Sequence, residues 1–283
     1  MRRTPRTVAR ALAIVLATVG GVALTADPAA AATTVRLVTT QTLAPGDTQH
    51  RVWNNANSGA YAVGLKGTPA DGDGSCSLRV LRSWYERHPS GEREFHYEFT
   101  NYSLEVCVVE VYLASFDAFR TSSFGELAPG QSAAKVWNNA HTDRYIYLTG
   151  AVPSQPASGV CQFETAGSYR SQPDGETEFV HSVRNIGSVS CSVEVRMVQL
   201  NVSYRSGMGS GPSPTGTVTV YPARNDVPSN LRVFVPGAVP SDPDEPCHLE
   251  VRRSDYLGPR FISMTYGLAG TNTCQFAATA AFF

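Results

Sequence analysis

Polar and apolar side chains alternate with a period of two along most of this chain. Residues 94–99 read Glu-Phe-His-Tyr-Glu-Phe, and residues 107–113 place Cys107, Val109, Val111 and Leu113 on one face of an extended segment. This alternation is typical of a half-buried β-strand, whereas a helix repeats its apolar positions every three or four residues. Beyond residue 32 no helical period is sustained. The pattern therefore predicts an all-β protein.

The chain also repeats itself at a fixed offset of 84 residues. Leu-Ala-Pro-Gly occurs at 43–46 and again at 127–130, and Val-Trp-Asn-Asn-Ala occurs at 52–56 and 136–140. Several later positions, cysteines included, match in the same frame. So many matches in one frame indicate a duplication.

A third, degenerate copy is expected after the duplicated pair. Cys247 and Cys274 fall near the frame of the earlier cysteines, but Tyr-Pro-Ala at 221–223 stands where Trp-Asn-Asn is expected. The stretch 206–216 is rich in Gly, Ser and Pro, which predicts a linker or a long turn. The expected boundaries of the three repeats are 33–118, 119–200 and 201–283.

Each repeat of about 80 residues has room for six or seven short strands, the size of an immunoglobulin-like β-sandwich. A barrel is the alternative, because strand order cannot be read from periodicity. The tetrapeptide at 43–46 lies between two extended runs and suits a type II turn with Pro45 at i+1 and Gly46 at i+2. The predicted fold is three tandem small β-sandwiches, each closed by one internal disulfide.

The six cysteines fall as one pair per repeat. A zinc site is the alternative, but the chain has no CxxC pair and no histidine spaced to join two thiolates. A disulfide that closes a loop of about 30 residues contributes on the order of 3–4 kcal/mol in the loop-entropy model. From the fifteen pairings that six cysteines allow, duplication selects one scheme. The predicted disulfides are Cys76–Cys107, Cys161–Cys191 and Cys247–Cys274.

The N-terminus has the features of a secretory signal peptide. Four arginines precede and flank an apolar segment at 11–24, and small residues at 28–32 offer cleavage after Ala32. About 14 apolar residues are too few to cross a bilayer, which needs roughly 20. We therefore expect removal of residues 1–32 and a secreted, extracellular product with no membrane span.

Charge and composition indicate which class of partner to exclude and what kind of genome encodes the chain. Loss of residues 1–32 removes four of the 23 basic and one of the 24 acidic residues, which leaves 19 and 23 and a net charge of −4. A net negative charge argues against nucleic acid as a partner. Only Lys66 and Lys135 are lysines, and together with the many alanines this indicates a bacterial genome of high GC content.

No catalytic constellation stands out. None of the six histidines occupies the same position in both copies, and His96 and His181 are expected to pack within strands. Glu92 and Glu94 come nearest to a pair of catalytic acids, since residues i and i+2 of a strand share a face about 6–7 Å apart. Without a cleft they are interpreted as solvated surface acids, and Asp-Gly-Asp-Gly at 71–74 as a surface turn that lacks the closing glutamate of a calcium loop. We expect a non-catalytic protein without a cofactor or a metal site.

The Val-Trp-Asn-Asn-Ala element is the clearest candidate for a binding site. A structural role would be a tryptophan that packs at the end of a strand, followed by a tight turn at the asparagines. In a functional role, the indole and the amides would together recognise a sugar. The candidate binding residues are Trp53, Asn54, Asn55, Trp137, Asn138 and Asn139.

The sequence thus predicts a secreted, non-catalytic binding protein with duplicate sites in the first two repeats, because two weak sites on one chain gain avidity. The ligand would be an extracellular glycan, a cell surface or a protein. One alternative is a structural or assembly subunit of a secreted complex, in which the C-terminal run ending at Phe282 and Phe283 pairs as an edge strand with another chain. Another is a secreted protease inhibitor that presents a disulfide-braced loop.

Overall fold

The computed structural model describes residues 33–138, 140–142, 144–172, 175–211, 217–220, 232–240, 247–257, 261–268 and 274–283. At 206–211, 217–220, 261, 268 and 274 only the backbone is described. The expected signal peptide, residues 1–32, lies outside the described residues. The described residues form eighteen β-strands and no helix, so the all-β prediction is confirmed. Within these ranges there is accordingly no helix with the length and apolar character that crossing a membrane requires.

The strands fall into three consecutive segments of six. The first segment comprises β1 (Thr33–Leu43), β2 (Thr48–Trp53), β3 (Ala60–Pro69), β4 (Ser77–Arg87), β5 (Arg93–Asn101) and β6 (Cys107–Phe116). The second comprises β7 (Arg120–Leu127), β8 (Ser132–Trp137), β9 (Tyr145–Pro153), β10 (Cys161–Ser171), β11 (Thr177–Asn185) and β12 (Cys191–Asn201). The third comprises β13 (Tyr204–Gly211), β14 (Thr217–Val220), β15 (Phe234–Pro240), β16 (Cys247–Leu257), β17 (Phe261–Leu268) and β18 (Cys274–Phe282).

The same antiparallel strand order occurs in every segment. The first, sixth and third strands form one three-stranded sheet, with the orders β1-β6-β3, β7-β12-β9 and β13-β18-β15. The second, fifth and fourth strands pair as β2-β5-β4, β8-β11-β10 and β14-β17-β16. An immunoglobulin domain pairs its first two strands within one sheet, whereas here they lie in different sheets. The expected immunoglobulin-like order is therefore not confirmed.

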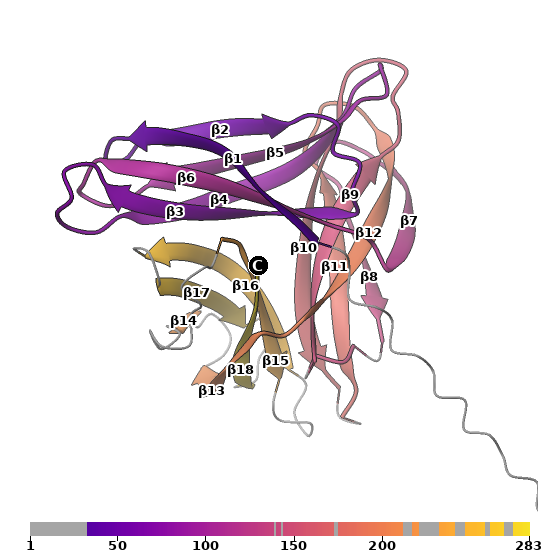
Figure 1. The fold of residues 1–283 in the computed structure, drawn as a ribbon. Coiled ribbons are helices and arrows are strands. Elements are labelled where there is room, and N and C mark those ends of the chain that lie inside the picture. The colour runs from indigo at the N-terminus through magenta and orange to yellow at the C-terminus, as the bar shows by residue number, and fades with distance from the viewer. Residues whose placement is uncertain are drawn as a thin grey trace, which may run out of the picture.

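The fourth strand of each segment joins the segments to one another (Figure 1). One end of each such strand pairs with the next segment, and its other end pairs with the previous one. The contacts join residues 85–87 of β4 to 161–163 of β10, 168–171 of β10 to 247–250 of β16, and 255–257 of β16 to 77–79 of β4. These three ladders form a closed ring and produce a single nine-stranded sheet. The segments are therefore hydrogen-bonded parts of one body.

The main hydrophobic core is continuous across the segments, with Phe95, Phe163 and Tyr256 all buried in the same cluster. The Tyr256 hydroxyl, from the third segment, donates a 2.8 Å hydrogen bond to the Val63 carbonyl of the first. Close approach between the first two segments depends on Gly150, since a Cβ there would stand 2.2 Å from the Gly59 carbonyl oxygen. Burial of apolar surface between the segments thus adds to the strand pairing.

Two short-range predictions hold. At the first Leu-Ala-Pro-Gly, Gly46 has φ of 81° and the Asp47 amide donates to the Ala44 carbonyl at 3.1 Å, which is a type II turn. Disulfides join Cys76 to Cys107 and Cys161 to Cys191, with Cα–Cα distances of 5.9 and 6.0 Å. Both pairings are confirmed.

Predictions for the third segment fare less well. Cys247 is disulfide-bonded, but the side chain of its expected partner, Cys274, lies outside the described residues, as do residues 221–223. The predicted linker at 206–216 is wrong in its first half, because β13 continues to Gly211 and pairs with β18. Glycine, which usually signals a break, is tolerated here because the strand has a partner to pair with.

The C-terminal strand is not an edge strand, contrary to the expectation on which the assembly alternative rested. β18 is the central strand between β13 and β15. The ring of Phe283 then packs edge-on against Phe116 of the first segment, with 5.1 Å between centroids. The C-terminus, marked C in Figure 1, is therefore built into the body.

Candidate functional site

The Trp-Asn-Asn element of the first segment lies at the end of β2. Trp53 is the last residue of the strand, pairs in register with Phe95 and is half-buried against the core. Asn54 and Asn55 follow it and are exposed. Asn55 has φ of 56°, in the left-handed region that asparagine enters more readily than most residues. The element thus forms a turn and also presents its amides to solvent.

A pocket of about 430 Å³ opens beside Trp53. Its lining includes Arg36, Asn54, Asn57 and Tyr61, and the Arg36 guanidinium carbon lies 5.7 Å from the indole centroid. An indole, amides, a guanidinium and hydroxyl groups are the functional groups that hold a polar, hydroxyl-rich ligand by ring contact and directed hydrogen bonds.

The second segment places its element in the same position, but the arginine that corresponds to Arg36 lies closer to the indole. Trp137 ends β8, pairs with Phe179 and is half-buried, and Asn138 is exposed. The Arg120 guanidinium carbon lies only 3.7 Å from the Trp137 centroid, so this indole face is covered by the chain itself. Asn139 lies outside the described residues.

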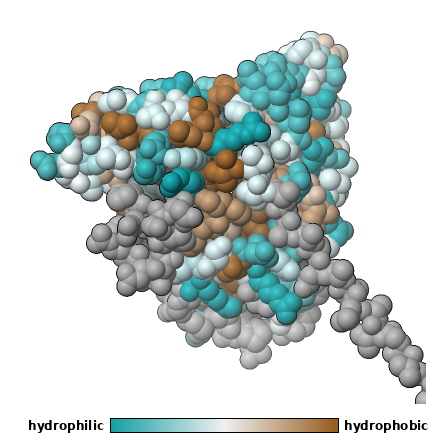
Figure 2. Space-filling model, viewed as in Figure 1, coloured by the Kyte–Doolittle hydropathy of each residue, from teal (hydrophilic) through white to brown (hydrophobic). Residues whose placement is uncertain are grey.

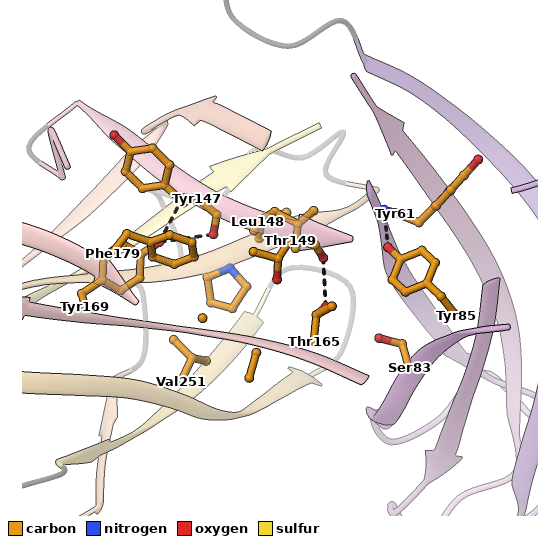
Figure 3. A pocket seen from close by; sticks show the side chains of 14 residues that line it. Tyr61, Ser83, Tyr85, Tyr147, Leu148, Thr149, Thr165, Tyr169, Phe179 and Val251 are labelled. Carbon is orange, nitrogen blue, oxygen red and sulfur yellow. Dashed lines mark hydrogen bonds between the residues drawn. The ribbon is translucent and has the colours of Figure 1, made fainter. Parts of the chain in front are cut away.

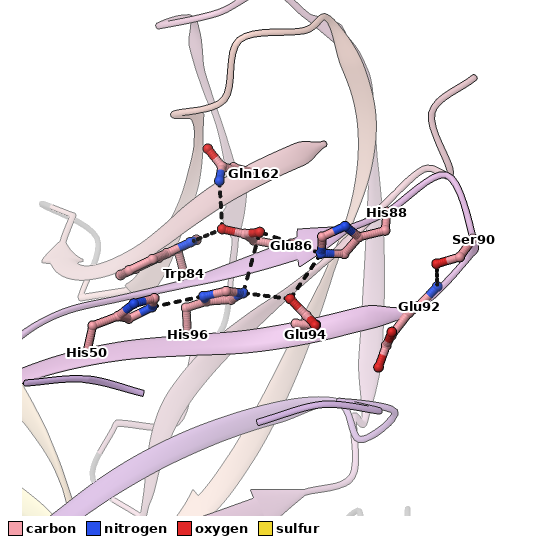
Figure 4. Close-up of polar contacts among 9 residues, drawn as sticks. All are labelled: His50, Trp84, Glu86, His88, Ser90, Glu92, Glu94, His96 and Gln162. Atoms are coloured by element: carbon pink, nitrogen blue, oxygen red, sulfur yellow. Dashed lines mark hydrogen bonds and ion pairs between the residues drawn. The ribbon is translucent and has the colours of Figure 1, made fainter. Parts of the chain in front are cut away.

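A second group of functional side chains gathers on the hairpin formed by β4 and β5 (Figure 4). The group consists of Glu86, His88, Glu94 and His96, and it is called the His–Glu cluster below. The Glu94 Oε2 atom lies 3.0 Å from the Nε2 atoms of both His88 and His96. The Glu86 Oε2 atom lies 3.5 Å from His96 Nε2 and 3.8 Å from His88 Nε2. Two carboxylate oxygens and two imidazole nitrogens therefore face a common point.

Backbone geometry brings these four side chains together. Glu86 and His88 are two positions apart along one arm of the hairpin, and Glu94 and His96 are two apart along the other. Side chains at i and i+2 of a strand share a face, and Glu86 lies directly opposite Glu94 in the ladder. Glu86 and His96 are buried, with 9% and 7% of their side chains exposed, whereas His88 is 34% exposed.

Further side chains hold the cluster in place. The Glu86 Oε1 atom accepts hydrogen bonds from Trp84 Nε1 at 2.7 Å and from Gln162 Nε2, on β10, at 2.6 Å. The His50 Nε2 atom lies 3.0 Å from the His96 Nδ1 atom. Glu86 and His96 therefore each use one polar side-chain atom, Oε1 and Nδ1, to contact a neighbour. The other polar atom of each side chain faces the cluster.

The cluster alters the protonation of Glu94 and His96. Burial works to raise the pKa of the Glu94 carboxyl, but hydrogen bonds and charge from His88 and His96 outweigh burial and hold that pKa below its usual value. Burial lowers the pKa of His96, against the opposing effects of Glu86 and Glu94. Glu94 is therefore an anion at neutral pH, and His96 is biased toward the neutral form.

Sequence reasoning missed the His–Glu cluster although a signal was present. Glu-x-His occurs twice, at 86–88 and 94–96, on either side of a Pro-Ser-Gly turn. The motif is not repeated in the second copy, because its histidines have no counterparts 84 positions later, where Gln172 and Val180 stand. The acid pair that was considered, Glu92 with Glu94, is not brought together: Glu94 faces the histidines, while Glu92 is directed away (Figure 4).

A smaller pocket, of about 260 Å³, lies where the three segments meet (Figure 3). Its tyrosines are already engaged by the fold: the Tyr85 hydroxyl accepts a hydrogen bond from the Tyr61 amide at 3.1 Å, and the Tyr169 hydroxyl accepts one from the Tyr147 amide at 3.0 Å. Burial raises the pKa of Tyr85 to about 12, so the hydroxyl stays protonated. This pocket is part of the joint between the segments.

On the face seen in Figure 2, the first segment carries apolar residues in several separate groups rather than in one large patch. The most exposed large apolar side chain of the described residues is Leu104, at 91%, in the loop between β5 and β6.

No protein-family model, curated protein or solved structure matches this chain.

Proposed function

We propose that this chain is a secreted, non-catalytic binding protein whose first segment binds a glycan in the pocket beside Trp53. The observation that carries the proposal is the pocket itself, in which the half-buried indole meets the exposed amides of Asn54 and Asn55 and the guanidinium of Arg36. Its volume of about 430 Å³ falls within the range of small-ligand sites.

The chemistry of the pocket favours a sugar over an apolar ligand. The apolar face of a pyranose can lie against an indole, and its hydroxyls can donate to and accept from carboxamides. Arg36 supplies donors only, so it favours a ligand that offers acceptor oxygens on that side. Trp53 is anchored in the core, and a rigid aromatic surface costs little entropy when the ligand binds.

The second segment serves as a weaker copy of this site. Trp137 and Asn138 hold the equivalent positions, but Arg120 occupies the indole face at 3.7 Å and has to move before a ligand can stack there. Two sites of unequal strength on one chain still gain avidity for a polymer or a cell surface, provided both can engage at once.

The proposal includes an origin for this arrangement: the three segments are copies of one β-sandwich module, each with its own disulfide, and the chain is exported. The 84-residue offset in the sequence and the common strand order support the copies. The two disulfides support an oxidising compartment.

A glycan array probed with the mature protein tests the proposal. Asn54→Ala should weaken binding by about tenfold or more, the loss of one or two hydrogen bonds to ligand. Asn138→Ala is the matched control in the weaker site and should have a much smaller effect. Unchanged binding in the double variant would move the site away from this element, and no glycan signal at all would refute the proposal.

One observation favours a second candidate function, protease inhibition. The loop at 102–106 precedes the disulfide-bonded Cys107 and exposes Leu104 at 91%. The Asn101 side chain braces this loop: its oxygen accepts from the Ser103 amide at 3.0 Å, and its nitrogen donates to the Glu105 carbonyl at 2.8 Å. A rigid loop with an exposed apolar side chain is suited to dock in a protease cleft.

A panel of secreted proteases tests this candidate. Inhibition should be lost in Leu104→Ser, which installs the residue found 84 positions later in the second segment, Ser188. Inhibition that survives this change would exclude the loop as the contact, and no inhibition by the unaltered protein would exclude the function.

A further inference from the structure

We propose that the His–Glu cluster is a binding site for one divalent transition-metal ion, and that zinc is the ion it fits best. The site would be separate from the glycan pocket. Trp53 pairs with Phe95 in the ladder, and His96 is the next residue along β5, so the two side chains lie on opposite faces of the same sheet.

The nitrogen–oxygen spacings in the cluster are those of a tetrahedral metal site. Bonds of about 2.0–2.1 Å from zinc to nitrogen or oxygen place neighbouring ligand atoms about 3.3 Å apart in a tetrahedron. The four nitrogen–oxygen distances in the cluster are 3.0, 3.0, 3.5 and 3.8 Å, on both sides of that value. The carboxylate oxygens of Glu86 and Glu94 and a nitrogen of His96 all lie within 4.8 Å of one another. His88 is outside this set of three, so its ring would have to close inward to complete the coordination.

The negative charges of the cluster also favour a bound cation. Glu86 and Glu94 are direct cross-strand neighbours, and like charges in such a pair destabilise a sheet. Both carboxylates are largely shielded from water, with 9% and 15% of their side chains exposed. A dication at the common point would neutralise both carboxylates and leave the imidazoles in the neutral form that binds metal.

The surrounding side chains orient the ligands in the way that metal sites require. Trp84 and Gln162 both donate to Glu86 Oε1, which leaves Oε2 to face the common point. When the His96 Nδ1–H donates to His50 Nε2, the lone pair of His96 Nε2 also faces it. His88, the most exposed member of the set, provides the side from which an ion would enter.

The ligand set selects the class of ion and its role. Calcium and magnesium prefer oxygen ligands in sets of six or more, whereas two imidazoles with two carboxylates in a tetrahedral array suit zinc. Four protein ligands leave no open position, so the ion would fasten the hairpin and, through Gln162, its contact with β10. The second segment lacks the set, with Arg170, Gln172 and Val180 in place of Glu86, His88 and His96.

Zinc titration of the mature, chelator-treated protein tests the proposal directly. Calorimetry should show one zinc ion per chain, and X-ray absorption should show four nitrogen or oxygen ligands with the outer-shell scattering of two imidazole rings. His96→Gln and His88→Gln should each weaken zinc binding by at least about 100-fold, and His50→Ala by about 10–100-fold. His88 is partly exposed, so its variant should stay folded even if the buried His96 variant does not.

The matched control is His141→Gln, because His141 is an exposed histidine outside the cluster. Its zinc affinity should equal that of the unaltered protein. No zinc bound by the unaltered protein would show that the cluster is an ion-pair network only, and binding as tight in His88→Gln would place the ion elsewhere. Tighter binding of calcium than of zinc would refute the ligand assignment. Zinc binding is measured without glycan, so either outcome is independent of the proposed function.

Discussion

The hairpins β4–β5 and β10–β11 pair alike over the half nearest their turns but have different outer faces. Residues 82–87 and 166–171 have the same register, so that Glu86 pairs with Glu94 where Arg170 pairs with Glu178, whereas only β4 has a register shift, between Val80 and Arg82. In the first hairpin this position holds two like charges beside two histidines. In the second it holds an Arg–Glu ion pair, to which Gln172 adds a hydrogen bond of 2.9 Å.

The inner faces of the two hairpins are nearly interchangeable. Tyr85 and Tyr169 are both buried and accept a hydrogen bond from a backbone amide of the third strand. Phe95 and Phe179 are both 1% exposed at matching positions. The comparison teaches that packing constrains the inner face, while the outer face carries different chemistry in each hairpin.

The largest loss of stability is expected at Asn101 and Asn185, which make matching hydrogen bonds in the first and second segments. Each side chain is fully buried and donates to two carbonyls, and its oxygen accepts an amide. Alanine at either position would remove three hydrogen bonds to buried or part-buried backbone groups, so each variant should lose about 3–5 kcal/mol of unfolding free energy in urea denaturation. The exposed Asn54→Ala should lose less than about 0.5 kcal/mol. Losses that differ between the two sites by more than about 2 kcal/mol would refute an equivalent scaffold.

A smaller effect, on the pH dependence of stability, is expected at His181 in the second segment. The first segment has Tyr97 at the corresponding position. Of the described buried side chains, His181 is one with no hydrogen-bond partner at either ring nitrogen, and it packs edge-on to Phe124. Burial, with help from Lys135 and Arg120, lowers its pKa to about 4. The unfolded chain therefore takes up the proton first as pH falls from about 6.5 to 4, and stability declines across that window.

His181→Phe should remove this contribution. The variant should be at least as stable as the unaltered protein at pH 7, and its advantage should grow by about 2–3 kcal/mol by pH 4. Thermal or urea unfolding at several pH values measures the difference, and His141→Gln, at an exposed histidine, should show no such trend. An advantage that is constant with pH would mean that His181 is not neutral in the folded protein.

The smallest expected effect is on stability, which should change in opposite directions when the charge pair of each hairpin is altered. In the presence of a chelator, Glu86→Gln removes a like-charge contact and keeps an oxygen for Trp84 and Gln162, so stability should stay level or rise by up to about 1 kcal/mol. Arg170→Gln removes the ion pair with Glu178 and should lower stability by about 1 kcal/mol, a modest value because Arg170 is 38% exposed. Equal losses in both variants would show that the two outer faces are not electrostatically different.

The sequence was most informative about local structure. The period-two pattern of 94–99 and 107–113 predicted strands, because alternation alone decides which side chains a strand can bury. One cysteine pair per repeat, at nearly constant separation, selected the Cys76–Cys107 and Cys161–Cys191 disulfides. Pro45 and Gly46 predicted a type II turn, since their backbone preferences fit its two central positions. Each prediction rests on neighbours in the chain or on a repeated frame.

Only the tertiary structure determined how the segments meet and where the chemistry gathers. The period of a strand says nothing about its partners, so the ring formed by β4, β10 and β16 could not be read from the pattern. Gln162 reaches Glu86 across 76 residues of chain through that ring. The two Glu-x-His segments at 86–88 and 94–96 do not by themselves show that they meet, and they form one cluster because a hairpin ladder sets Glu86 opposite Glu94. Backbone preferences act between neighbours in the chain, whereas a site is made by residues that folding brings together.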